Sequence, residues 1–261
     1  MKAIKLAVAF ALIGSANLAL ADTFTNGGFE NGDLSGWSQG GGNWYYGPGA
    51  GGNAPLNPAV YAGGPSLNTV MTGGTDAITG ANTVYNGKYS VRVNDSNNGA
   101  NVSTISQTVA NYTDNNIYFA WNAVLEDSHG LFDSGHFALT LHDDTTGTDV
   151  VTRGYSSAGA IGGGTTGVTW NTYNSGWSTW YSSGWVVENI DVAALGLLGH
   201  TFTLSLLAAD CYWTGHGGYV YLDGFGAYVP PPTGVPVPAA VWLFGTAAAG
   251  FLGFRRKSKL A

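Results

Sequence analysis

Apolar and polar residues alternate at every second position in four short segments of this chain. These segments are residues 89–93, 137–141, 202–206 and 219–222. The period is that of a β-strand, in which successive side chains point to opposite faces of a sheet. A fifth segment, 117–125, is nearly all apolar, and we expect it to be a central strand buried on both faces. The pattern predicts an all-β domain folded as an antiparallel β-sandwich.

The composition agrees with many strands joined by turns. Glycine accounts for 41 of the 261 residues, aromatic residues for 13% and charged residues for 10%. A disordered chain would be richer in charge and poorer in aromatic residues. Two glycine-rich stretches, 40–80 and 154–167, have little apolar periodicity and are predicted to be long loops. One or two helical turns are predicted at 191–199, where Asp191 would cap the first turn.

Charge is distributed unevenly along the chain. Six of the nine basic residues lie near the two ends, whereas all sixteen acidic residues lie between Asp22 and Gly234. Only Lys88, Arg92 and Arg153 are basic in that region, so its formal charge is 3 − 16 = −13. Such a surface repels polyanions, which argues against nucleic acid as a partner and is compatible with cation binding.

The first 21 residues have the features of a secretory signal peptide. Lys2 and Lys5 form a basic start, an apolar stretch follows, and Ala19 and Ala21 provide the small residues of a cleavage site. This interpretation predicts a short signal helix, export through the inner membrane and a mature chain that begins at Asp22. The alternative is an N-terminal membrane anchor, for which the apolar stretch is short.

The last 32 residues form a second distinctive segment. A proline-rich spacer at 230–234 precedes the sequence Val-Pro-Val-Pro, an uncharged run from 239 to 254 and a basic cluster. The uncharged run predicts a transmembrane helix with its basic end in the cytoplasm. The residues on which this interpretation depends are Val235, Pro236, Val237, Pro238, Ala239, Trp242, Leu243, Phe244, Phe254, Arg255, Arg256 and Lys257.

In its order and spacing, the segment 235–261 resembles the PEP-CTERM sorting domain. In that family a short Pro-Glu-Pro motif precedes a transmembrane helix and a basic end. The resemblance implies recognition by an exosortase, anchoring in the inner membrane before processing, and then a cell-surface or extracellular location. Val237 stands where the family motif has glutamate, which leaves the position of cleavage open.

Three motifs of the central region, 22–229, resemble carbohydrate-binding-module-like jelly rolls. They are Phe24–Trp37, with its Asn-Gly-x-Phe-Glu type turn and Gly-Trp, Asn86–Val93, and Tyr219–Phe225. The resemblance implies a jelly-roll β-sandwich in which the first motif, Phe24–Trp37, forms the first strand.

The same resemblance implies a structural Ca²⁺ ion between the first and last strands. Its carboxylate ligands would be Glu30 and Asp223, with main-chain carbonyls near Gly32 and Lys88. Calcium prefers six to eight hard oxygen ligands, which an acidic glycine-rich domain can provide. The alternative is that both carboxylates cap turns and face water.

Aromatic residues in the predicted loops provide a candidate carbohydrate site. Trp44, Tyr45 and Tyr46 lie between glycine runs and are expected to expose rings that could stack on sugars. The alternative is that such rings fill the core. A second segment, 210–219, contains Asp, Cys and His among three glycines and is either a structural turn or a loop that contacts a ligand.

No nucleophile elbow, phosphate loop, zinc-protease motif or dinucleotide fingerprint is present, and no pair of carboxylates stands out as a glycosidase pair. We therefore predict a non-enzymatic surface or matrix protein that contacts extracellular polysaccharide in a biofilm or floc. One alternative is a small secreted hydrolase that uses Asp210 and His216, near the single cysteine, Cys211. Another is a purely structural surface protein without a specific ligand.

Overall fold

The computed structural model describes residues 24–45, 57–127, 134–157 and 168–226. The signal segment 1–21 and the sorting tail 230–261 lie outside these residues, as does Tyr46. Within the described ranges, no helix has both the length and the apolar character needed to cross a membrane.

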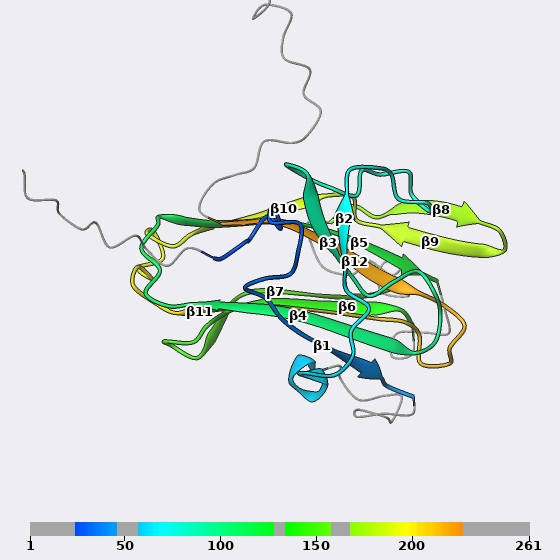
Figure 1. Cartoon of the computed structure of the whole chain (residues 1–261), viewed down its shortest axis with the longest axis horizontal. Coiled ribbons are helices and arrows are strands. Elements are labelled where there is room, and N and C mark those ends of the chain that lie inside the picture. The colour runs from blue at the N-terminus through cyan, green and yellow to red at the C-terminus, as the bar shows by residue number, and fades with distance from the viewer. Residues whose placement is uncertain (1–23, 46–56, 128–133, 158–167, 227–261) are drawn as a thin grey trace, which may run out of the picture.

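Two antiparallel sheets pack face to face, as the alternating pattern predicted (Figure 1). The first sheet has five strands, in the spatial order β1 (Ser38–Asn43), β4 (Asn101–Val109), β11 (Phe202–Ala209), β6 (His136–Asp143) and β7 (Thr148–Ser156). Every pairing within it is antiparallel. A 3-10 helix, η1 (Pro58–Tyr61), lies against the outer side of this sheet beside β1.

The second sheet has seven strands. Six follow the order β2 (Thr69–Thr72), β3 (Tyr89–Val93), β12 (Gly218–Gly226), β5 (Asn116–Glu126), β9 (Ser178–Ser182) and β8 (Asn171–Ser175). The seventh, β10 (Val186–Asp191), pairs with the first half of β5, and β9 pairs with the last residues of β5. The five strands predicted from the sequence are therefore confirmed as β3, β5, β6, β11 and β12.

The apolar core lies between the two sheets. Its largest side chains include Trp121 of β5 and Phe137 of β6, whose ring centroids are 5.1 Å apart across the interface. A bidentate ion pair also links the sheets, because Arg153 Nε and Nη2 donate to the two oxygens of Glu188 at 2.8 Å. The indole of Trp121 donates to the same carboxylate, so Glu188 joins three strands.

The glycine-rich stretch 40–80 was predicted to be a long loop, and its described part contains regular structure instead. Gly40–Asn43 belong to β1, and η1 and β2 follow. A Cβ atom on Gly40 would clash with the carbonyl of Tyr61, and one on Gly41 would clash with the carbonyl of Pro65. Glycine is therefore required here because the chain after η1 crosses β1 at close range, and glycine leaves no apolar periodicity to detect. Similarly, Gly154 belongs to β7 rather than to a loop.

The opening motif 24–37 was expected to form the first strand, and it forms consecutive turns instead. Asn26 and Phe29 adopt left-handed φ angles of 54° and 58°, which interrupt any extended strand. The Asn26 side chain holds the turns by accepting from Asn31 N and donating to Asp33 O. Phe29 and Trp37 nevertheless reach the core and stack on each other.

The predicted helical turns at 191–199 are present as hydrogen-bonded turns. Asp191 Oδ1 accepts from the backbone N–H of Ala194 at 2.8 Å, which is the capping contact expected from the sequence.

Candidate functional site

A row of five hydroxyl residues crosses the outer face of the five-stranded sheet. Each strand contributes one residue at the same register position, in the order Ser38, Ser106, Ser205, Thr140 and Thr152. On β4, β11, β6 and β7 the neighbours along the strand include inward-facing core residues, and Ser38 follows the core residue Trp37, so these five side chains face away from the core. Because adjacent strands lie about 4.8 Å apart, the row is roughly 19 Å long.

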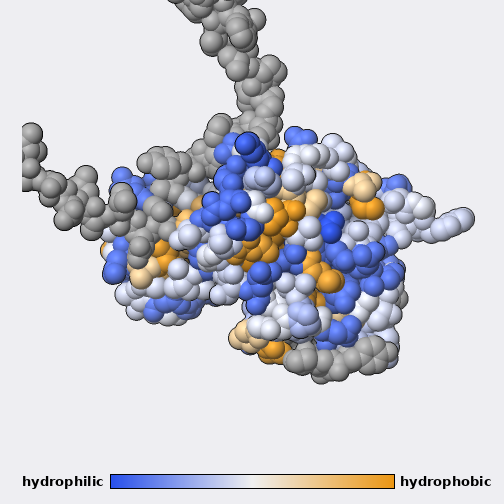
Figure 2. Space-filling model, in the orientation of Figure 1, coloured by the Kyte–Doolittle hydropathy of each residue, from blue (hydrophilic) through white to orange (hydrophobic). Residues whose placement is uncertain are grey.

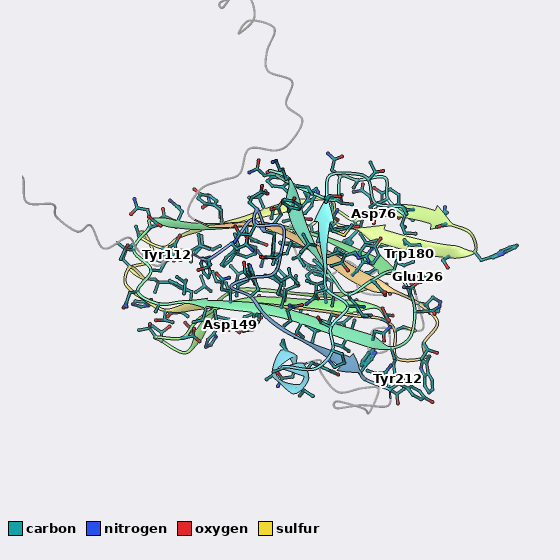
Figure 3. All side chains as sticks on the ribbon, viewed as in Figure 1. Asp76, Tyr112, Glu126, Asp149, Trp180 and Tyr212 are labelled. Carbon is teal, nitrogen blue, oxygen red and sulfur yellow. The ribbon has the colours of Figure 1, made fainter. Side chains whose placement is uncertain are left out.

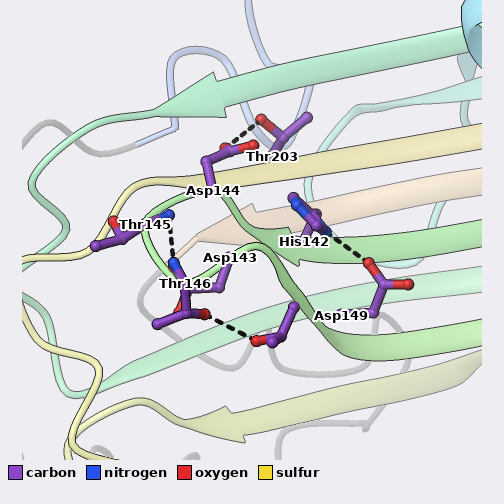
Figure 4. Close-up of polar contacts among 8 residues, drawn as sticks. His142, Asp143, Asp144, Thr145, Thr146, Asp149 and Thr203 are labelled. Carbon is purple, nitrogen blue, oxygen red and sulfur yellow. Dashed lines mark hydrogen bonds and ion pairs between the residues drawn. The ribbon is translucent and has the colours of Figure 1, made fainter.

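These five hydroxyls are accessible and take part in no hydrogen bond with any described residue. The next row toward the β6–β7 turn behaves differently. There Thr108 bonds to Thr203. Thr203 donates to Asp144, and His142 pairs with Asp149 at 2.6 Å (Figure 4). The hydrogen bond that His142 Nδ1 donates to Asp149 Oδ1 raises the pKa of His142. Polar groups of the second row therefore satisfy one another, whereas those of the first row remain available to a ligand.

A groove of about 500 Å³ lies over three of the five hydroxyls of the row. Ser106 and Ser205 form part of its floor, together with Ser38 and Thr104. Residues of η1 and the chain after it form one wall; they are Pro58, Ala59, Ala62 and Gly63. No lining residue is charged. The groove thus combines small apolar surfaces with hydroxyl groups, which suits an uncharged polyhydroxylated ligand better than a phosphate or carboxylate.

Sequence reasoning did not find this hydroxyl row. Serine and threonine occur throughout the chain, and the five residues come from segments up to 167 positions apart in sequence. Their alignment follows from strand order and register, which the alternating pattern does not specify.

An aromatic cluster continues the outer face beyond the end of β1. Figure 3 shows Tyr212 near the end of β1. Its ring centroid is 4.9 Å from that of Tyr45 and 5.0 Å from that of Trp213, and Trp213 is 55% exposed. Trp44, which was expected to expose its ring, is only 1% exposed because it packs among Tyr61, Val102 and their neighbours on the outer face. The expected exposure of Trp44 is therefore wrong, whereas the half-buried Tyr45 remains at the edge of the cluster.

The loop 210–219 forms a turn around a buried cysteine. Cys211 Sγ accepts from Gly215 N at 3.2 Å and lies 3.5 Å from His216 Nδ1. The Asp210 carboxylate contacts asparagine side chains and not His216, so the acid–histidine pair needed by the hydrolase alternative is not formed. The same loop forms a structural turn and places Trp213 in the aromatic cluster.

Asp210 is buried within a polar network. Oδ1 accepts from Asn94 Nδ2 at 2.8 Å, and Oδ2 accepts from Asn101 N and Nδ2 at 3.0 Å. Burial raises the pKa of Asp210 to about 8, although the hydrogen bonds from Asn101 act in the opposite direction. Burial therefore favours the protonated carboxyl more in the folded protein than in the unfolded chain.

The two residues expected to bind calcium are close together. A side chain on Gly28 would place its Cβ 3.7 Å from Glu30 Cγ and 3.9 Å from Asp223 Oδ1. Glu30 accepts from Lys88 N at 2.9 Å, and Asp223 Oδ2 accepts from the backbone N–H groups of Tyr85 and Asn86. Turn capping, the alternative considered from the sequence, is thus present for both carboxylates.

One oxygen of this pair is not accounted for by turn capping. Asp223 Oδ1 is buried and has no hydrogen-bond partner among the described residues. Burial raises the pKa of Asp223 to about 7, and the negative charge of Glu30 adds to the increase. The described residues contain no group of three or more His, Cys, Asp or Glu side chains placed to hold a metal. A cation here would therefore need main-chain carbonyls in addition to the two carboxylates.

Comparisons with known proteins give only distant similarities. No protein-family model and no curated protein sequence matches the chain. Among solved structures, TmCBM61 in complex with β-1,4-galactotriose is 13% identical, with a TM-score of 0.38 over 77% of this chain and 93% of that one. The module CBM27-1 of Caldicellulosiruptor saccharolyticus, in complex with mannohexaose, is 11% identical, with a TM-score of 0.38 over 79% and 97%.

A third solved structure belongs to an enzyme. The enzymatically active domain of tailspike protein 4 of bacteriophage CBA120 is 12% identical, with a TM-score of 0.34 over 78% of this chain and 21% of that one. None of these similarities is close enough to assign a ligand or an activity. The structural class of the protein therefore follows from its fold, which is an antiparallel two-sheet β-sandwich with a hydroxyl-lined groove on one outer face.

The raised pKa of Asp210 predicts a pH-dependent contribution to stability. A group whose folded pKa lies above its unfolded value near 3.9 destabilises the fold progressively as pH rises from about 4 to 8. Asp210→Asn should remove this slope, which is at most about 1.4 kcal/mol per pH unit. Urea unfolding at pH 5 and pH 8 should show a smaller difference in unfolding free energy for the variant than for the wild type. The control is Asp149→Asn, which removes an exposed carboxylate. If Asp210→Asn shows the same difference in unfolding free energy between pH 5 and pH 8 as the wild type, Asp210 does not have the raised pKa.

Proposed function

We propose that this protein is a non-catalytic polysaccharide-binding protein that binds an uncharged glycan chain along the hydroxyl row. The single observation that supports the proposal is the alignment of five accessible hydroxyls that have no hydrogen-bond partner among the described residues. A glycan presents hydroxyl donors and acceptors at regular intervals, and serine and threonine can act as either. The row can therefore bond to successive sugars without any charged group.

The groove supplies the second requirement of a glycan site, which is apolar contact with the sugar rings. Pro58 and Ala59 of η1 form a low apolar wall over the floor that contains Ser106 and Ser205. Beyond the buried aromatic residues of the outer face, Tyr45 and the half-exposed Trp213 offer ring surfaces for stacking. We infer that the groove binds the glycan and that the aromatic cluster contacts the glycan at one end of the groove. Tyr46 remains a further candidate for glycan stacking, on the evidence of the sequence alone.

Filling the groove should weaken glycan binding strongly. Ser205→Tyr places a ring over the floor, and we expect the affinity for a neutral polysaccharide to fall by more than tenfold. The gentler Ser106→Ala removes one hydroxyl and should cost about 0.5–1.5 kcal/mol, or about two- to tenfold in affinity. Affinity electrophoresis through gels that contain galactan, glucomannan or xylan would measure both effects.

The matched control for the groove variant is Thr172→Tyr on β8. It introduces the same side chain at an exposed strand position on the other sheet, so it should leave the affinity unchanged. Equal retardation of Ser205→Tyr and wild type would disprove the groove as the binding site.

We also propose that Glu30 and Asp223 hold a structural Ca²⁺ ion. The support is the buried, unpartnered Asp223 Oδ1 beside a second carboxylate, since a cation would satisfy that oxygen and offset both charges. The ion would join the turn at Glu30 to strand β12, and hence link two distant parts of the chain.

Calcium should raise the melting temperature of the wild type. A site occupied at a hundred times its Kd contributes about 2.7 kcal/mol, which corresponds to a shift on the order of 5 °C for a domain of this size. Asp223→Asn should remove the shift. Asp210→Asn is the matched control because Asp210 is also buried, but both of its oxygens already have partners, so its calcium response should persist. Identical melting curves of the wild type in Ca²⁺ and in EDTA would refute the metal site.

We further propose that residues 1–21 direct export and that 235–261 direct exosortase-dependent sorting to the cell surface or the extracellular matrix of a biofilm or floc. Both proposals are supported by the sequence motifs alone. Mass spectrometry of the surface-exposed protein should find an N-terminus at Asp22 and a C-terminus near Val235–Pro238. In a host without the exosortase, the tail should remain intact and in the membrane. An intact tail on the released protein would contradict the sorting proposal.

A further inference from the structure

A two-stranded hairpin projects from the edge of the seven-stranded sheet and presents a tryptophan at its tip. Strands β8 and β9 pair along their full length and are joined by Gly176 and Trp177 (Figure 1). Gly176 adopts the positive φ of 63° that suits the first position of such a turn. Trp177 is fully exposed and makes no ring contact with any described residue.

The base of this hairpin is fixed to the domain. Trp180 of β9 is 5% exposed and packs with Val124 and Tyr219 of the seven-stranded sheet, and Tyr173 of β8 packs against the same cluster (Figure 3). The tip is therefore held in position by an anchored base, so a ligand that contacts Trp177 would not have to order the hairpin first.

The surroundings of Trp177 limit the kind of partner that it can bind. No charged residue or histidine occurs in the sequence between Arg153 and Glu188, and the nearest charged neighbour from another segment is Asp127, whose backbone N–H donates to Thr179 O at 2.7 Å on β9. The exposed tip is pale in Figure 2 because Ser, Gly and Trp have intermediate hydropathy. The residues beside the tip, Ser175 and Ser178, are small and polar. An anchored aromatic ring flanked by uncharged hydrogen-bonding groups matches the chemistry of a neutral sugar ring.

Two other partners fit less well. A lipid surface would need additional apolar side chains or basic residues near the tip, and the sequence provides neither there. A second copy of this chain would bring together two domains that each have a formal charge of −13 over residues 22–234, which opposes association.

We propose that Trp177 is a second contact for a neutral polysaccharide, separate from the groove, so that one domain can bridge two glycan chains. This inference depends on the proposed function for the class of ligand, and it adds the location and the consequence of a second site. The groove lies on the outer face of the five-stranded sheet, whereas the hairpin extends from the edge of the other sheet (Figure 1). Because the two contacts belong to different layers, one glycan strand in the groove leaves Trp177 free to bind another.

Bead agglutination tests the bridging directly. Beads coated separately with galactan, glucomannan or xylan are mixed with the wild type, Trp177→Ala, Ser205→Tyr and the double variant. We expect Trp177→Ala to remain bound to the beads, with less than about a threefold loss of retention relative to the wild type. Its agglutination of the beads should be at least about tenfold lower, because crosslinking needs two linked contacts. The double variant should lose retention altogether. Trp177→Tyr should restore part of the agglutination, and Thr179→Ala on the same hairpin should behave like the wild type.

Each contrary result has a distinct meaning. Full agglutination by Trp177→Ala would overturn the second contact and leave the groove proposal intact. Failure of the wild type to bind any beads would overturn both proposals. Two further measurements are made without glycan. If sedimentation shows that the wild type self-associates and Trp177→Ala does not, the tip binds a second copy of the chain. If the wild type binds phosphatidylcholine vesicles more strongly than Trp177→Ala does, the tip binds lipid. Either result would overturn the proposal.

Discussion

The absence of side chains at Gly40 and Gly41 is the constraint on which the candidate site depends. Because the backbone after η1 passes within clash distance of any Cβ at these positions, only glycine allows the chain to cross β1 there. The crossing places η1 over the outer face and creates the wall of the groove. The groove therefore depends on this local close approach of the chain to β1.

The two faces of the five-stranded sheet have different roles because successive side chains of each strand point to opposite faces. Leu206 and Leu139 point inward and join the core, while Ser205 and Thr140, their neighbours along the strands, point outward. The inner residues hold the two sheets together through burial. The outer hydroxyls contribute nothing to that packing and form no hydrogen bond with any described residue, which leaves them available to the proposed ligand.

Much of the fold could be predicted from the sequence, because strands with alternating or wholly apolar residues follow directly from burial. The strands that the sequence analysis missed lack an alternating apolar pattern. Strand β1 contains three consecutive glycines, and β8 is an exposed edge strand with little apolar pattern. The site could be predicted only in part. Proximity of Glu30 and Asp223 was expected by resemblance, whereas the burial of Trp44 and the hydroxyl row depend on long-range register that local patterns do not contain.

The buried carboxylates of this domain are bound mainly by neutral donors. Asp76 accepts from the hydroxyls of Tyr219 and Tyr221, and Asp210 from asparagine side chains. Among described residues, only Arg153 pairs a carboxylate with a permanent cation. Dissolved electrolyte would therefore screen the mutual repulsion of the acidic surface and weaken few attractive pairs. The consequence is a domain whose stability should tolerate brackish or saline surroundings and large swings in ionic strength.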